Sequence, residues 1–173
     1  MKKKILVPII SGVAIIFLSA SSVLHISGMA NYSGSPVDGG ATTVGQCSGC
    51  HSGGSSTPTQ AVTATPAFGG SGNNKTYVAG TTYTITLTPS GSYPMYGMNL
   101  EIINSQGTTA GTSVAMFGTF GAAVSSNCQI YSAATCAPYP PCASHNTASA
   151  SAFKFKWTAP ASGTGFLYSN VLG

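Results

Sequence analysis

Residues Cys47 to His51 have the sequence CSGCH, the clearest chemical signature in the chain. The spacing Cys-x-x-Cys-His is typical of c-type haem attachment. Cys47 and Cys50 can reach the two vinyl groups on one edge of a porphyrin and form thioethers, and His51 can then bind the iron. The sequence therefore predicts one covalently attached haem c, with His51 as an iron ligand.

Two other uses of this motif stay open. A Cys47–Cys50 disulfide is feasible although sterically tight. A zinc site would need a second pair of ligands at short spacing, which Cys136 and Cys142 supply only awkwardly. A thioredoxin-like redox motif would need a βαβ context, and the sequence shows none.

Residues 1–30 are expected to be a cleaved export signal. Three lysines precede the apolar run Ile5–Leu18, and Gly28-Met29-Ala30 has the small-x-small pattern of a cleavage site. The apolar run is shorter than the roughly 20 residues of a bilayer span. We therefore expect an exported protein of the periplasm, cell surface or extracellular space, with no stable membrane span after cleavage.

The composition favours a β-rich fold and excludes several functions. Only 5% of the residues are charged, against roughly 25% in an ordinary domain, and the chain has 22 glycines. After cleavage the chain keeps three basic residues, Lys75, Lys154 and Lys156, and two acidic residues, Asp38 and Glu101. The net charge of the mature chain is therefore 3 − 2 = +1, and it contains no arginine. This charge does not support nucleic-acid binding. The two acidic residues lie far apart in sequence and no hydrolase motif is present, so we do not expect turnover of an organic substrate.

The mature chain is expected to divide into an arm and a sandwich. Residues 31–75 are rich in Gly, Ser, Thr and Pro, contain CSGCH and have one short strand near 60–64. Residues 76–173 alternate apolar and polar side chains in short runs between Gly/Pro turns, which is typical of an all-β antiparallel sandwich. Such runs occur at 82–88, 96–102, 114–117, 153–157 and 166–168.

The alternation also predicts which face of each strand a side chain lies on. Met98 falls on the apolar face of its strand, with Asn99 and Glu101 pointing outward. Phe153, Phe155 and Trp157 share one face of a later strand, and sandwich core is a commoner use of such a face than a haem pocket.

Several segments resemble, in order, the bacterial Reeler-like domain, also called the choice-of-anchor V domain. They are CSGCH, YVAGTTYTITLTPS, YGMNLEII and SHNTASASAFKFKWTAPASGTGFLY, and they lie between Asn31 and Tyr168. The resemblance implies a Reeler/Ig-like β-sandwich with an irregular N-terminal haem-binding arm. In that family a His followed by Thr or Ser usually precedes the WTAP-type strand, and the matching residue here is His145.

His145 is the candidate for the second axial iron ligand. The mature chain has only two histidines, and the other is His51. The alternatives are that His145 is a solvent-exposed loop histidine, or that Met95 binds the iron instead. His/Met ligation would raise the reduction potential relative to two histidines. An open sixth position would favour gas binding or peroxidase chemistry.

Three further cysteines leave an odd number after haem attachment. A Cys128–Cys142 or a Cys136–Cys142 disulfide is expected to bridge the Pro-rich loop before His145. The chain ends at Gly173, where the resembling domains continue into another strand. Either the chain is truncated, or a sheet edge stays open and allows self-association.

The main functional prediction is one-electron transfer by an exported monohaem c-type cytochrome-like protein. Its partner would be a redox protein or an extracellular electron acceptor. The alternative is a non-enzymatic surface adhesion or matrix module in which the haem is structural or sensory.

Overall fold

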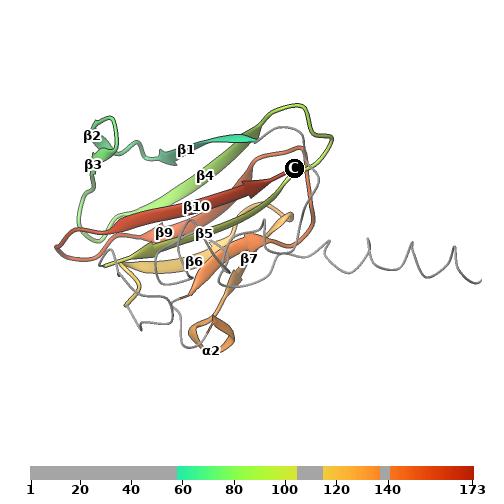
Figure 1. The fold of residues 1–173 in the computed structure, drawn as a ribbon. Helices are drawn as coiled ribbons and strands as arrows, with labels where there is room; N and C mark the ends of the chain where they lie inside the picture. Colours follow the sequence, from blue (N-terminus) through green and yellow to red (C-terminus); the bar gives the residue numbers. More distant parts are fainter. Residues whose placement is uncertain (1–57, 105–114, 137–140) are drawn as a thin grey trace, which may run out of the picture.

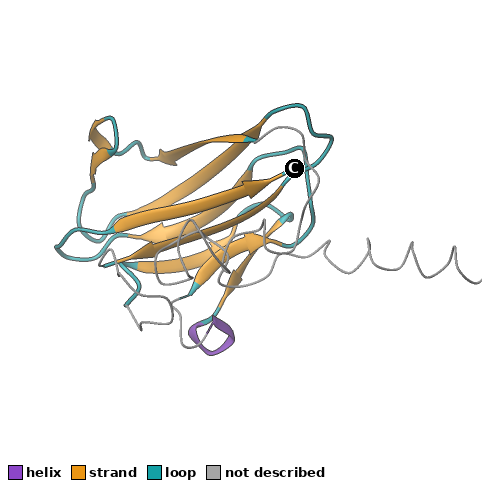
Figure 2. Ribbon diagram, viewed as in Figure 1, coloured by secondary structure: helices purple, strands orange, loops and turns teal. Residues whose placement is uncertain are grey.

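The computed structural model describes residues 58–104, 115–136 and 141–173. The predicted export signal and the CSGCH motif lie outside these residues. Strands make up most of the described chain (Figure 2). The elements are β1 (Thr59–Thr65), β2 (Gly69–Ser71), β3 (Asn74–Thr76), β4 (Thr82–Ser90), β5 (Gly97–Ile103), β6 (Thr119–Ala123), β7 (Cys128–Tyr131), α2 (Ala133–Cys136), β8 (Cys142–His145), β9 (Phe153–Thr158) and β10 (Phe166–Leu172).

Two four-stranded antiparallel sheets form the body of the domain (Figure 1). The first has the order β1-β4-β9-β6 and the second has the order β10-β5-β8-β7. The β2–β3 hairpin stands at one end of the body, and the single turn of α2 projects below β7. The predicted all-β antiparallel sandwich is confirmed.

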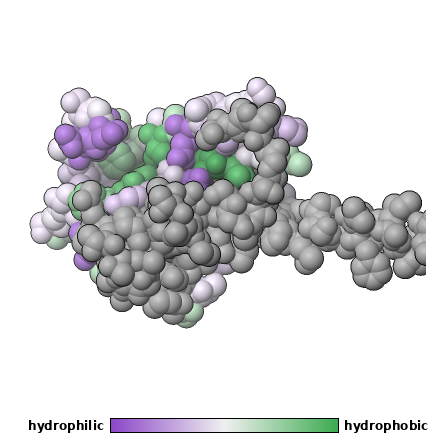
Figure 3. Space-filling view, viewed as in Figure 1, coloured by the Kyte–Doolittle hydropathy of each residue, from purple (hydrophilic) through white to green (hydrophobic). Residues whose placement is uncertain are grey.

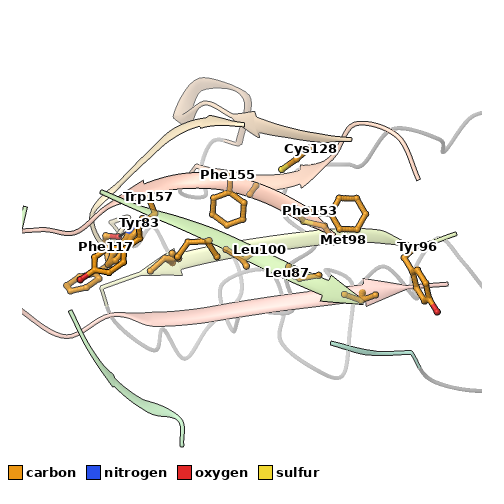
Figure 4. Close-up of a cluster of buried hydrophobic side chains, with 14 of the residues drawn as sticks. Tyr83, Leu87, Tyr96, Met98, Leu100, Phe117, Cys128, Phe153, Phe155 and Trp157 are labelled. Atoms are coloured by element: carbon orange, nitrogen blue, oxygen red, sulfur yellow. Dashed lines mark hydrogen bonds between the residues drawn. The ribbon is translucent and has the colours of Figure 1, made fainter. Parts of the chain in front are cut away.

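The core lies between the two sheets and follows from the alternation in the sequence. Tyr83, Ile85 and Leu87 of β4 point to the same side as the aromatic residues of β9, and Ile85 pairs with Phe155. Met98 and Leu100 of β5 meet them from the second sheet (Figure 4). Each of these six side chains is at most 1% exposed, so apolar burial drives the packing of the layers.

Aromatic rings close one end of the core. Trp157 stacks on Phe117 with ring centroids 6.2 Å apart, and its Nε1–H donates to the Phe117 carbonyl at 2.8 Å. Tyr83 and Phe68 pack on the same indole. The buried indole N–H therefore has an acceptor, and the prediction that the aromatic face of β9 is core is confirmed.

The strands agree only in part with the predicted runs. The short strand predicted near residues 60–64 is confirmed as β1, but it pairs along its whole length with β4 and so belongs to the first sheet, although its residues lie in the range assigned to the arm. The β2–β3 hairpin in the same range was not predicted. Residues 114–117 do not form a strand in their described part: Met116 makes one isolated bridge with Ile103, and Phe117 enters the core. β6, β7 and β8 lack a clear alternating pattern and were not predicted.

The C-terminal strand β10 pairs with β5 and lies at one edge of the second sheet. Gln60 of β1 donates from Nε2 to the Ser169 carbonyl of β10 at 2.9 Å, which links the two sheets at this edge. Within the described ranges, no helix is long and apolar enough to cross a bilayer.

Candidate functional site

The structure describes two of the predicted site residues. His145 ends β8, and Met95 lies in the turn before β5 with 55% of its surface exposed. Cys47, Cys50 and His51 lie outside the described residues. The described part of the candidate site therefore consists of the end of β8 and the adjacent strand β5.

The candidate site lies on the outer face of the second sheet, which we define as the face turned away from the core. Met98, Leu100 and Ile102 of β5 point into the core, so the alternate residues of β5 point to the outer face. The strand register adds their neighbours. The members of the outer face are Gly97, Asn99, Glu101 and Ile103 of β5, Cys142 and Ser144 of β8, Gln129 and Tyr131 of β7, and Tyr168 and Asn170 of β10.

The middle of this outer face, on β5 and β8, is buried although it faces away from the core. Asn99 is 1% exposed, and Glu101 and Ser144 are 0% exposed. Asn99 donates from Nδ2 to Ser144 Oγ at 3.4 Å, and Ser144 Oγ–H donates to the Met98 carbonyl at 3.2 Å. Asn99, Glu101, Cys142 and Ser144 each take part in at least one further interaction. The sequence alternation correctly gives the direction of Asn99 and Glu101, but it does not predict that both side chains are buried.

His145 lies beside the backbone of β5. A Cβ atom on Gly97 would come within 2.8 Å of His145 Cε1, so the ring occupies the space over this glycine. His145 Nδ1 lies 3.1 Å from both the Met98 nitrogen and the Met98 carbonyl oxygen. Met98 N–H donates to Nδ1 in one tautomer, and Nδ1–H donates to the carbonyl in the other. Binding of a metal through Nε2 requires the second tautomer.

Neighbouring side chains hold the end of β8 in place. Gln129 Nε2 donates to the His145 carbonyl at 3.0 Å and to the Tyr131 hydroxyl at 3.0 Å. His145 is half-buried and fixed by these contacts, so it is not a freely solvated loop residue. Met98 is 0% exposed in the core, as its sequence position predicts.

The expected Cys128–Cys142 disulfide is wrong. Cys128 pairs with His145 across β7 and β8, whereas Cys142 pairs with Tyr131. The two cysteines are therefore three residues apart along the ladder, on opposite faces of the sheet, and Cys128 carries a free thiol in the core. The side chain of Cys136 lies outside the described residues, so the Cys136–Cys142 pairing stays a prediction.

Metal ligands do not cluster within the described ranges. They contain no group of three or more His, Cys, Asp or Glu side chains that could hold a metal ion. The combination of His145 with Cys47, Cys50 and His51 therefore stays a prediction.

Sequence reasoning missed the contributions of Gly97 and Glu101. The only local signal is the sequence GMNLEII, where polar Asn99 and Glu101 alternate with apolar residues. Alternation tells which face a residue points to. It does not tell whether another part of the chain covers that face.

The comparisons with known proteins give one family match and several similar solved structures. The Reeler domain family profile matches residues 47–170. Among solved structures, the human F-spondin reeler domain (fragment 1) is 18% identical, with 65% of this chain and 72% of that chain covered and a TM-score of 0.46. The Reelin-N domain of F-spondin is 17% identical, with 71% and 78% covered and a TM-score of 0.47. No curated protein matches the chain.

Cys128 should make stability depend on alkaline pH. Burial raises the pKa of its thiol from 9.0 to about 12. Between pH 9 and about 12 the unfolded state releases a proton that the folded state keeps, so the free energy of unfolding falls with rising pH. The Cys128 contribution should approach about 1.4 kcal/mol per pH unit. Urea unfolding across this range should show a flatter pH dependence for Cys128→Ala, and an equal slope in both proteins would contradict the assignment.

The packing of His145 on Gly97 can be tested by a double-mutant cycle. Gly97→Ala should lower the free energy of unfolding by about 1–3 kcal/mol, because the new methyl group clashes with the imidazole ring. In a His145→Ala background the same change should be neutral or stabilising by up to about 1 kcal/mol, since alanine suits a strand better than glycine. Equal effects of Gly97→Ala in both backgrounds would show that the ring does not occupy this space.

Proposed function

The chain belongs to the Reeler domain family, and from this membership we propose that it is an exported, non-enzymatic adhesion or matrix module carrying one haem c. The match over residues 47–170 supports an adhesion role. The CSGCH sequence supports the haem. The observation that carries the adhesion proposal is the exposed outer face of the first sheet.

This surface, which we call the threonine–lysine face, consists of ordered cross-strand rows. One row contains Thr63, Thr86 and Lys154, and the next contains Thr65, Thr84 and Lys156. A third row contains Thr82, Thr158 and Thr119. Hydroxyl groups and two ammonium groups thus cover a regular antiparallel surface.

The positive charge of the threonine–lysine face favours an anionic partner. Lys154 and Lys156 are exposed and lie about 7 Å apart along β9. The only acidic residue within the described ranges is Glu101, which is buried in the other sheet. A polymer with regularly spaced anionic groups and many hydroxyls complements this face. The proposed partner is therefore an acidic polysaccharide of a cell surface or matrix.

The predicted haem fits the donor set of the chain. Cys47 and Cys50 would form the thioethers, and His51 and His145 would bind the iron. Met98 lies at hydrogen-bonding distance from His145 Nδ1, and such a contact fixes the orientation of an imidazole that binds metal through Nε2. When bound, haem c supplies reversible one-electron exchange. The ring of His145 lies over Gly97 and within hydrogen-bonding distance of the Met98 backbone.

One-electron transfer is the second candidate function. It is favoured by the CSGCH motif together with a second histidine that the fold holds in a fixed position. In this case the partner is a redox protein or an extracellular electron acceptor. The adhesion role does not depend on this redox role.

Binding to polygalacturonate tests the adhesion proposal. The double variant Lys154→Ser/Lys156→Ser should bind about tenfold more weakly than the wild type, because two attractive charges are lost. Added salt should weaken wild-type binding. Lys75→Ser is the matched control, since Lys75 is exposed on the β2–β3 hairpin, the hydrophilic patch at the upper left of Figure 3. Equal losses in both variants, or salt-independent binding, would contradict a specific role for the threonine–lysine face.

Haem attachment is tested in cells that contain the cytochrome c maturation system. The wild type should carry covalent haem on a haem-stained denaturing gel and in a pyridine haemochrome spectrum. Cys47→Ala/Cys50→Ala should abolish it, whereas Cys128→Ala should retain it. His145→Ala should shift the Soret band and permit carbon monoxide binding, while Met95→Ala should not. A colourless wild type would remove the haem from the proposal and leave the adhesion module.

A further inference from the structure

The two lysines of β9 lie between a strand that carries threonines and a strand that carries a glycine. On one side, β4 places Thr84 opposite Lys156 and Thr86 opposite Lys154. On the other side lies β6, where Gly121 is exposed. Both lysines are exposed as well. Lys156 therefore has a neighbour with a hydroxyl group on one side and a neighbour without a side chain on the other.

Gly121 lies against the base of the Lys156 side chain. A Cβ atom at Gly121 would come within 2.9 Å of Lys156 Cβ, a contact too short for two carbon atoms. The adjacent Phe120 packs on Phe155 with ring centroids 5.3 Å apart, so β6 is held in place from the core side. The register between β6 and β9 shifts between Phe120 and Ala123, where the glycine lies. A larger residue at position 121 would fit only if the stem of Lys156 moved.

The rows that contain the lysines differ from the rows at the two ends of the threonine–lysine face. Thr82 Oγ1 lies 2.9 Å from Thr158 Oγ1, and Thr59 Oγ1 lies 2.6 Å from Ser90 Oγ. These end rows are closed by bonds between their own hydroxyl groups. The lysine rows between them present an ammonium donor beside a hydroxyl group. The only acidic side chain of the described ranges, Glu101, is buried in the other sheet, so the lysine rows are suited to an external anion.

The two ammonium groups follow one strand. Alternate residues of a strand are about 7 Å apart, and neighbouring strands are about 4.8 Å apart. A polymer chain that lies along β9 can contact both lysines and has the hydroxyl groups of β4 beside it. A polymer chain that crosses the strands follows one row and meets one lysine. Charge complementarity therefore favours the orientation along β9 for a polymer with a carboxylate on each sugar.

We propose that Lys154 and Lys156 bind two carboxylates of one polyuronate chain lying along β9, and that Gly121 positions Lys156 for this contact. The inference rests on the proposed adhesion function and adds to it the orientation of the polymer and an uncharged residue that controls binding. Gly121 acts through Lys156, because the absence of a side chain at position 121 leaves room for the stem of the lysine.

Binding of polygalacturonate to Gly121→Ala tests the positioning role. The substitution should weaken binding about twofold to fivefold, the range expected for one exposed ion pair. It should do the same in a Lys154→Ser background and have no effect in a Lys156→Ser background, because residues 121 and 156 are coupled. A loss of stability alone would weaken binding in every background. An equal loss in the Lys156→Ser background, or no loss in the wild-type background, would overturn the positioning role.

Gly69→Ala is the matched control for this substitution. The new methyl group would collide with Thr76 Oγ1 on the β2–β3 hairpin, so this variant also places a methyl group against a neighbouring strand. The hairpin is not part of the first sheet, and binding of polygalacturonate should stay at the wild-type level. A loss equal to that of Gly121→Ala would show that the effect is not specific to Lys156.

Binding of tetragalacturonate tests the orientation of the polymer. Lys154→Ser and Lys156→Ser should each raise the dissociation constant about twofold to fivefold and keep one oligomer bound per protein. Titration calorimetry at protein concentrations above the dissociation constant gives both quantities. Oligomers that cross the strands would occupy two separate rows. Each single variant would then keep the wild-type dissociation constant and lose one of two sites, which would overturn the orientation along β9.

The outcomes separate this inference from the adhesion function. Wild-type protein that does not bind polygalacturonate would refute the adhesion proposal itself. If the wild type binds, Lys154→Ser/Lys156→Ser binds weakly and Gly121→Ala binds like the wild type, only the positioning role is refuted. If Gly121→Ala does not fold, nuclear Overhauser contacts in the wild type should join the Gly121 α-protons to the Lys156 side chain and bound tetragalacturonate to both lysines. Oligomer contacts with Lys75 alone would overturn the proposal.

Discussion

The burial of β5 on both faces is the constraint on which the domain depends. Met98 and Leu100 of this strand pack into the core, while Asn99 and Glu101 are buried on the opposite side. A central strand with one apolar and one polar buried face must satisfy two different requirements. The core side needs close packing, and the outer side needs a partner for every polar group. Hydrogen bonds from Ser144 and Asn99 meet part of the second requirement.

The two sheets consequently use their outward faces in different ways. The first sheet exposes threonine and lysine side chains that water can solvate, so this face needs no internal partner. The second sheet buries Asn99, Glu101 and Ser144, so its polar groups are committed to contacts within the protein. A solvated face suits the binding of an external polymer, whereas a covered polar face suits the holding of a segment or cofactor of the chain. The proposed adhesion and haem roles are therefore assigned to opposite sides of one sandwich.

The sequence pattern predicted the elements whose alternation is strong and local. In β4 and β9 every second residue is apolar, which gave both the strands and the core face of Trp157. β7 and β8 are short and contain Cys, Ala, Ser and His without a clear apolar period. Their pairing depends on contacts between residues far apart in the chain, so local pattern could not supply it. The disulfide expected between Cys128 and Cys142 failed for the same reason, because the register sets these residues on opposite faces.

The candidate site shows the same division between local and long-range information. The Cys-x-x-Cys-His spacing is a local signal, and it could be recognised without a structure. The surroundings of His145 depend instead on the position at which the backbone pairing between β8 and β5 ends. Beyond the Asn99–Ser144 pair the backbone of β8 no longer continues the ladder, and the imidazole reaches the Met98 backbone in its place. Because Met98 offers both a donor and an acceptor to Nδ1, the tautomer of His145 responds to whatever occupies Nε2. A metal at Nε2 would require Nδ1–H to donate to the Met98 carbonyl, which already accepts from Ser144. The Met98 backbone of β5 thus connects His145, the predicted ligand on β8, to the buried polar face of the same sheet.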